Sequence, residues 1–189
     1  MLIMFLDLAV QTGYAYGRPG EKPKAGVVRV KKPSDPLHIA PWNLETFLQD
    51  INAFGLPDLI AYEAPIPLNA AMSDGRPRSA EALLIPIKLE QAVERYCLPR
   101  QIRWERLYPA TIRKHFLGKA NFGQRDETKR AVLDRCRLLG YIDRDRVVRN
   151  KSSDPLFDEA DALAGWDCAS AKYARARPAE LMLFGERAG

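Results

Sequence analysis

Histidine and cysteine are scarce in this chain. Its 189 residues include 2 histidines and 3 cysteines, and the cysteines (Cys97, Cys136 and Cys168) lie far apart without a Cys-x-x-Cys pair. This scarcity argues against a zinc site, and the odd number of cysteines argues against a disulfide framework. We therefore expect reduced thiols, as in a cytoplasmic protein.

Long apolar runs are absent as well. The first run, residues 2–6, is ended by Asp7 and is too short for a signal peptide. No segment approaches the roughly 20 apolar residues that a membrane span needs. With 47% hydrophobic residues, the chain suits one globular domain. We expect that domain over residues 1–172, a C-terminal extension over 173–189, and no contact with a membrane.

Positive charge is concentrated in one part of the chain. Residues 99–151 contain 15 Lys plus Arg and 6 Asp plus Glu, whereas the rest contains 14 and 18. This asymmetry indicates a polyanionic partner, such as a nucleic acid, bound on one side of the molecule. For any single basic residue, a solvated helix face is the alternative interpretation.

The apolar periodicity predicts an α/β domain around a mixed sheet. Strands are expected at residues 2–8, 12–17, 25–31, 59–63 and around 102–104. The first three follow one another closely and predict an antiparallel meander. Helices are expected at 41–54, 79–98, 109–117, 126–139 and 154–172. Pro86 should kink or split the helix over 79–98, because proline cannot donate a backbone hydrogen bond.

Four acidic residues stand where a metal site would need them. Asp7 and Glu63 each follow an apolar strand, and Asp158 and Asp161 are three apart on the last helix. Residues at that spacing share a helix face, with Cβ atoms about 5–6 Å apart. Carboxylates are the preferred ligands of Mg²⁺ and Mn²⁺, and two such ions about 3.5–4 Å apart assist phosphodiester hydrolysis. Each acid alone is explained by a strand end or a helix cap, but the combination favours a metal-dependent phosphodiesterase.

The same segments resemble the RuvC-type branch of the ribonuclease H-like superfamily, which includes the Holliday junction resolvases of bacteria and phages. The resemblance rests on LDLAVQTGYA (6–15), IAYE (60–63) and DEADALA (158–164), with a weaker match over 108–129. It implies a ribonuclease H-like fold, with three antiparallel strands followed by parallel strands and flanking helices. Two departures are Ala9, where many relatives have glycine, and Pro86 in the helix expected near a dimer contact.

By this resemblance, Asp7, Glu63, Asp158 and Asp161 are expected to be the catalytic metal ligands. Mg²⁺ is the expected ion, with Mn²⁺ as a substitute. The expected substrate is branched DNA such as a four-way junction, cut by a homodimer in a bacterial or phage-infected cytoplasm. The residues expected to bind DNA are Arg76, Arg78, Lys114, Lys119, Arg125 and Lys129.

Other functions were weighed against this one. A nuclease for RNA, hybrid or flap substrates and a non-catalytic nucleic-acid-binding module remain open alternatives. A helicase is excluded, because Asp158-Glu159-Ala160-Asp161 lacks an upstream phosphate-binding loop: Gly118-Lys119 is followed by Ala120. An actin-like or sugar-kinase fold shares the first hairpin but requires a second domain, for which the chain is too short.

Overall fold

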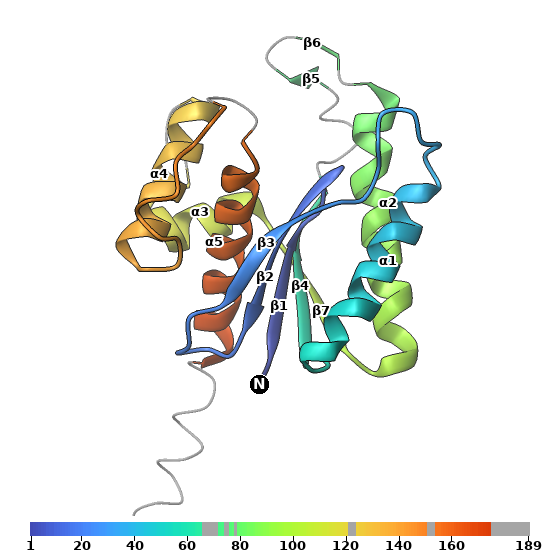
Figure 1. Ribbon diagram of the computed structural model, residues 1–189, viewed down its shortest axis with the longest axis horizontal. Coiled ribbons are helices and arrows are strands. Elements are labelled where there is room, and N and C mark those ends of the chain that lie inside the picture. Colours follow the sequence, from blue (N-terminus) through green and yellow to red (C-terminus); the bar gives the residue numbers. More distant parts are fainter. Residues whose placement is uncertain (66–71, 74–75, 78, 121–123, 151–153, 175–189) are drawn as a thin grey trace, which may run out of the picture.

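The computed structural model describes residues 1–65, 72–73, 76–77, 79–120, 124–150 and 154–174. A five-stranded sheet in the order β3-β2-β1-β4-β7 forms its centre (Figure 1). The strands are β1 (Ile3–Asp7), β2 (Gln11–Gly17), β3 (Lys24–Arg29), β4 (Leu59–Glu63) and β7 (Arg103–Leu107). Strands β3, β2 and β1 are antiparallel, and β4 and β7 add in parallel to β1. The predicted fold class is confirmed.

Helices cover both faces of this sheet (Figure 1). One face carries α3 (Pro109–Leu117), α4 (Arg125–Leu138) and α5 (Pro155–Ala174). The other carries α1 (Ile39–Ile51) and α2 (Ala80–Cys97), which end in the short 3-10 turns Asn52–Phe54 and Leu98–Arg100. Between β4 and α2, the described residues include a small hairpin, β5 (Met72–Ser73) with β6 (Arg76–Pro77).

The alternation of side chains along β1 divides the core in two. Ile3 and Phe5 pack under α5, whereas Met4 and Leu6 pack under α1 and α2, and all four are almost fully buried. A strand covered on both faces reads as a continuous apolar run, which explains the sequence of β1. Because successive side chains alternate, Asp7 continues the row that faces α5.

Two sequence-based expectations need correction. Pro86 does not split the predicted helix, since α2 continues from Ala80 to Cys97 with Pro86 inside it. The missing backbone hydrogen bond is offset by the flanking side chains Ile85 and Leu89, which are buried against the sheet. The third strand, expected over 25–31, ends at Arg29, and Lys31 beyond it is buried in a 2.7 Å ion pair with Glu81.

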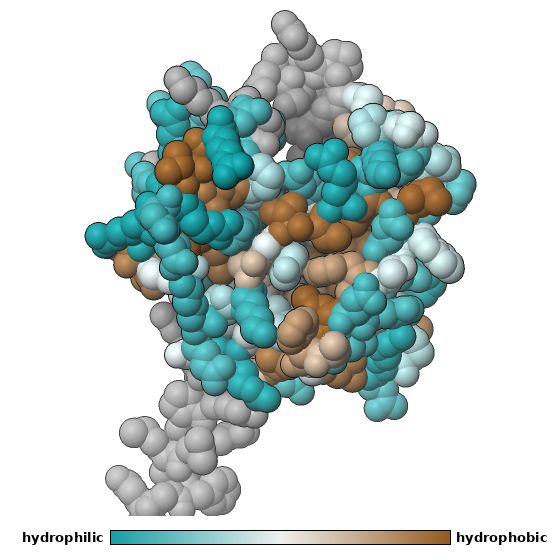
Figure 2. All heavy atoms as spheres, in the orientation of Figure 1, coloured by the Kyte–Doolittle hydropathy of each residue, from teal (hydrophilic) through white to brown (hydrophobic). Residues whose placement is uncertain are grey.

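The surface differs between the two sides of the sheet. In Figure 2, hydrophilic side chains predominate on the α4 side around a smaller hydrophobic patch, and hydrophobic side chains gather in the middle of the face. The three cysteines are buried and carry free thiols. In the part of the chain that the structure describes, no helix combines the length and the apolar character that a bilayer crossing requires.

Candidate metal centre

Asp7 and Glu63 end neighbouring parallel strands on the same side of the sheet. The register of β1 and β4 pairs Leu6 with Tyr62, so the two acids occupy the next level. Leu59 and Ala61, which alternate with Glu63 along β4, lie in the core under α5. Both acidic side chains therefore face the helix that carries the other two predicted ligands.

Gly13 allows the first turns of α5 to reach the sheet at this level. Gly13 is the β2 partner of Asp7. A Cβ atom on Gly13 would lie 2.1 Å from the carbonyl oxygen of Asp158 and 3.2 Å from the Cβ of Ala162. Any larger residue would push the helix away, because real Cβ atoms do not approach backbone so closely. The glycine in the hairpin thus places Asp158 beside Asp7.

Three of the four acids have strongly raised pKa values. Burial, followed by the charges of Asp7 and Asp161, raises the pKa of Glu63 to about 8. Burial and the charge of Asp7, with a smaller contribution from Asp158, raise the pKa of Asp161 to about 7. Burial and Asp158 raise the pKa of Asp7 to about 6. Because the charge of at least one other of the four acids contributes to each of these three shifts, the acids form one electrostatic cluster.

Three of the four acids have no direct partner in the described part of the protein. Asp7, Glu63 and Asp161 have no hydrogen-bond or ion-pair partner among the described residues. Across those residues, no three His, Cys, Asp or Glu side chains are grouped closely enough to hold a metal ion as they stand. Hard oxygen donors with unneutralised charge nevertheless suit a divalent cation such as Mg²⁺. The metal site remains a prediction that fits the chemistry of its donors.

Basic side chains from α3 and α4 surround the acids. Lys129 lies 3.5 Å from a carboxylate oxygen of Asp158 and lowers the pKa of both Asp7 and Asp161. Arg125 also acts on Asp7, and Arg113 acts on Glu63 and Asp161. The predicted DNA-binding residues Lys129 and Arg125 therefore stand beside the acidic cluster.

The remaining predicted DNA-binding residues are described only in part. Lys114 is exposed on α3, and Lys119 is exposed in the loop that follows. Arg78 lies outside the described residues, and of Arg76 only the backbone, in β6, is described. Their role in DNA binding stays a prediction.

Sequence reasoning missed two residues of the site, Arg113 and Gln11. On α3, Ile112 and Phe116 are buried, so the helical period places Arg113 at the edge of the inner face, unlike Lys114. Gln11 donates a 2.6 Å hydrogen bond from Nε2 to Oδ2 of Asp158. The strand period could have indicated it, because Gln11 shares a face with Gly13.

Other acids on or next to α5 have structural partners. Asp154 accepts hydrogen bonds from the backbone N–H groups of Arg149, Asn150 and Leu156. Burial acts against its ionisation, but these hydrogen bonds, with that of Leu156 the largest, lower the pKa of Asp154 overall. Glu159 is buried in a two-pronged ion pair with Arg146, at 2.6 and 2.8 Å. Asp154 therefore caps the start of α5.

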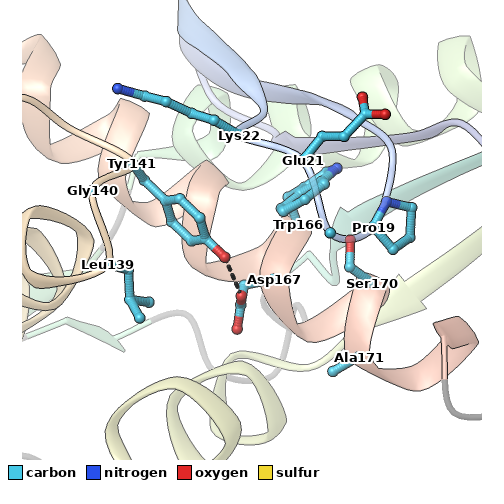
Figure 3. A pocket seen from close by; sticks show the side chains of 11 residues that line it. Pro19, Glu21, Lys22, Leu139, Gly140, Tyr141, Trp166, Asp167, Ser170 and Ala171 are labelled. Atoms are coloured by element: carbon cyan, nitrogen blue, oxygen red, sulfur yellow. Dashed lines mark hydrogen bonds between the residues drawn. The ribbon is translucent and has the colours of Figure 1, made fainter.

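A cavity of about 410 Å³ lies further along α5, away from the acidic cluster (Figure 3). Its walls include Trp166 and Asp167 of α5, and Tyr141, whose hydroxyl donates a 2.6 Å hydrogen bond to Asp167. The other carboxylate oxygen of Asp167 lies 2.8 Å from Nε2 of His115. None of the four predicted metal ligands lines this cavity.

Solved structures of RuvC-type proteins share the fold. Thermus thermophilus RuvC matches 93% of this chain with 96% of its own, at a TM-score of 0.62 and 18% identity. The structure of RuvC from that organism in complex with a Holliday junction substrate matches 94% of this chain and 96% of its own. The TM-score is 0.61 and the sequence identity is 15%. Ydc2, the yeast mitochondrial Holliday junction resolvase, matches 96% of this chain and 83% of its own, with a TM-score of 0.54 and 15% sequence identity.

By sequence, no protein-family model and no curated protein matches the chain. The structural likeness nevertheless shows the fold: the chain has the ribonuclease H-like fold of RuvC, as the resemblance of its motifs predicted.

Proposed function

We propose that the chain is a divalent-metal-dependent endonuclease that hydrolyses phosphodiester bonds in branched DNA, with the Holliday junction as its preferred substrate. The observation that carries this proposal is the cluster of Asp7, Glu63, Asp158 and Asp161 at the ends of β1 and β4. Perturbed carboxylates of this kind are typical of functional sites. The likeness to RuvC and Ydc2 supports the junction as substrate.

In this proposal the four carboxylates would hold Mg²⁺, with Mn²⁺ as a substitute. Two such ions supply an activated water and stabilise the leaving oxygen. The carboxylates themselves must be ionised to bind cations, and Lys129 and Arg113 favour the ionised forms. The glycine contact at Gly13 keeps α5 seated on the sheet, so that its two acids stay beside those of the strands.

The basic residues would bind the DNA backbone next to the cut. Arg113, Arg125 and Lys129 surround the acids, so a phosphate drawn to them would meet the carboxylate cluster. Lys114, Lys119, Arg76 and Arg78 would extend the contact along the strand. If they do, DNA affinity falls steeply with salt, because each neutralised phosphate releases counterions.

Symmetric cutting of a junction calls for two active sites, so we propose a homodimer. Exposed apolar side chains on the α1–α2 side support this proposal, since Trp42 is 68% exposed and Leu84 of α2 is 39% exposed. Sedimentation of the purified protein tests it directly, and a monomer at micromolar concentration would contradict it.

The decisive experiment compares four substrates with Mg²⁺ present: a four-way junction, a flap, an RNA–DNA hybrid and a linear duplex. Asp7→Asn serves as the inactive variant, and Asp50→Asn, on an exposed residue of α1, as its matched control. We expect the wild type and Asp50→Asn to cut the junction preferentially.

Three other results would redirect the proposal. Preference for the hybrid would point to a ribonuclease H-type nuclease. DNA binding without cleavage or cation binding would indicate a non-catalytic module. Equal activity of Asp7→Asn and wild type would refute the assignment of the site.

A further inference from the structure

Strand β2 presents alternate residues to α5, and only the first of them is long. Gly13, Ala15 and Gly17 leave room for the helix: Gly13 is against Asp158, and a Cβ on Gly17 would lie 3.5 Å from the ring of Trp166. Gln11 occupies the same face one step before Gly13. Its amide reaches the side chain of Asp158, whose backbone rests on Gly13.

The amide of Gln11 is held in one orientation. Gln11 and Arg29 are directly opposed on β2 and β3, and an Nη2 atom of Arg29 donates a 3.3 Å hydrogen bond to Oε1 of Gln11. A guanidinium can only donate hydrogen bonds, and an ionised carboxylate can only accept them. The oxygen of the amide must therefore face Arg29, and its nitrogen must face Asp158.

The two carboxylate oxygens of Asp158 thus have different partners, one neutral and one charged. Oδ2 accepts the 2.6 Å hydrogen bond from the neutral amide of Gln11. Oδ1 lies 3.5 Å from Nζ of Lys129, which is 15% exposed. A hydrogen bond from a neutral donor fixes the rotation of a carboxylate without cancelling its charge, so the group can still bind a cation. The chain from Arg29 through Gln11 to Asp158 resembles the outer partners that orient ligands at metal sites.

We propose that Gln11, oriented by Arg29, is a positioning residue that sets the direction of the Asp158 carboxylate for a divalent cation. This inference rests on the proposed function, because it assumes that Asp158 is a metal ligand. It adds two residues, neither of them acidic, on which cation affinity depends. Gln11 acts only through Asp158 and does not itself touch the substrate.

Calorimetric titration with Mn²⁺ alone, without DNA, tests the proposal. Gln11→Met keeps the length of the side chain but cannot donate, and we expect a 10- to 100-fold weaker Mn²⁺ affinity, on the order reported for outer-shell partners. Arg29→Met leaves the amide in place but frees its rotation, and a smaller loss, roughly 3- to 10-fold, is expected. Gln49→Met, at an exposed glutamine of α1, is the matched control and should bind Mn²⁺ as the wild type does.

A double-mutant cycle separates positioning from a general loss of stability. If Gln11 acts through Asp158, Gln11→Met causes no further loss of Mn²⁺ affinity in an Asp158→Asn background. Additive losses, or Gln11→Met and Arg29→Met affinities within about twofold of the wild type, would overturn the inference while leaving the proposed function intact. Should Gln11→Met fail to fold, Arg29→Met decides alone. A wild-type protein that neither binds Mn²⁺ nor cuts a junction would instead overturn the proposed function, and this inference with it.

Discussion

The acids of helix α5 fall into two groups that differ in how their charge is neutralised. Glu159 has a two-pronged partner in Arg146, and Asp167 lies between Tyr141 and His115. Asp161, in the same helix, has no such partner among the described residues, and the nearby charge of Asp7 raises its pKa further. One helix therefore holds acids that stabilise the fold and an acid that the fold leaves unsatisfied.

The presence or absence of a partner distinguishes the acids that stabilise the fold from those that we expect to serve function. Burying an unneutralised carboxylate costs free energy, so it persists where another requirement demands it. Glu159 and Asp167 have their partners outside the cluster and gain nothing from a cation there, whereas the unpaired acids Asp7, Glu63 and Asp161 would be stabilised by one. Substitutions in the two groups should consequently have opposite effects on stability and activity.

The largest effect is expected for Asp161→Asn. Loss of one ligand should reduce cleavage of a four-way junction by about 10³-fold or more. The metal-free variant should melt at a higher temperature than the wild type, because a buried like charge has been removed. Cleavage rates and calorimetric melting of the same preparations measure both. Unchanged cleavage, or a lower melting temperature, would place Asp161 with the structural acids.

Glu159→Gln should act in the opposite way. The variant loses the charged partner of Arg146, and the free energy of unfolding should fall by about 2 kcal/mol, less than for a fully buried pair because Arg146 is 46% exposed. Cleavage at 25 °C should stay within about threefold of the wild type, since Glu159 faces away from the cluster. Urea unfolding gives the first value. If Glu159→Gln folded but did not cleave DNA, Glu159 would belong with the acids of the metal site, and the two groups of acids would not differ as proposed.

Stability of the metal-free protein should depend on pH in the window set by the cluster. The folded-state pKa values of Asp7, Asp161 and Glu63 are about 6, 7 and 8, above their ordinary values, so the folded state holds protons that the unfolded state releases. The stabilisation is complete at low pH and is lost as pH rises through these values.

The expected fall in Tm between about pH 5.5 and 8.5 is roughly 5 °C. Mg²⁺ should reduce it, because cation binding favours the ionised carboxylates. Differential scanning calorimetry with and without Mg²⁺ measures the effect. A Tm that rises over this range in metal-free buffer, or the same slope in Asp161→Asn as in the wild type, would argue against the raised pKa values.

The smallest effect is expected for Asp167→Asn. The amide still accepts one hydrogen bond, so the loss at Tyr141 or His115 should reduce the free energy of unfolding by about 1 kcal/mol. Junction cleavage should be unaffected, because Asp167 lies toward the cavity of Figure 3 and away from the acids. Urea denaturation and a cleavage assay at matched folded fraction provide the test, and a specific loss of cleavage would extend the site along α5.

Much of the fold and most residues of the candidate site could be predicted from the sequence. The apolar runs before Asp7 and Glu63 identified two central strands, and the helix expected at 154–172 is α5. Lys31 and Gln11 were missed for a shared reason: each depends on a partner far away in the chain, Glu81 in one case and Asp158 in the other. Periodicity shows which face a side chain occupies, but not what lies across from it.

The sequence by itself determined the elements, their order and the four acids, because strand and helix periods and helix-start signals act over a few residues. Only the tertiary structure decided which acids remain unsatisfied. Asp158, Glu159, Asp161 and Asp167 are chemically alike in the sequence, and the packing of α5 onto Gly13 turns each toward a different neighbour. Charge interactions depend on distance and burial, and both are set by contacts between segments more than a hundred residues apart, such as Gln11 with Asp158.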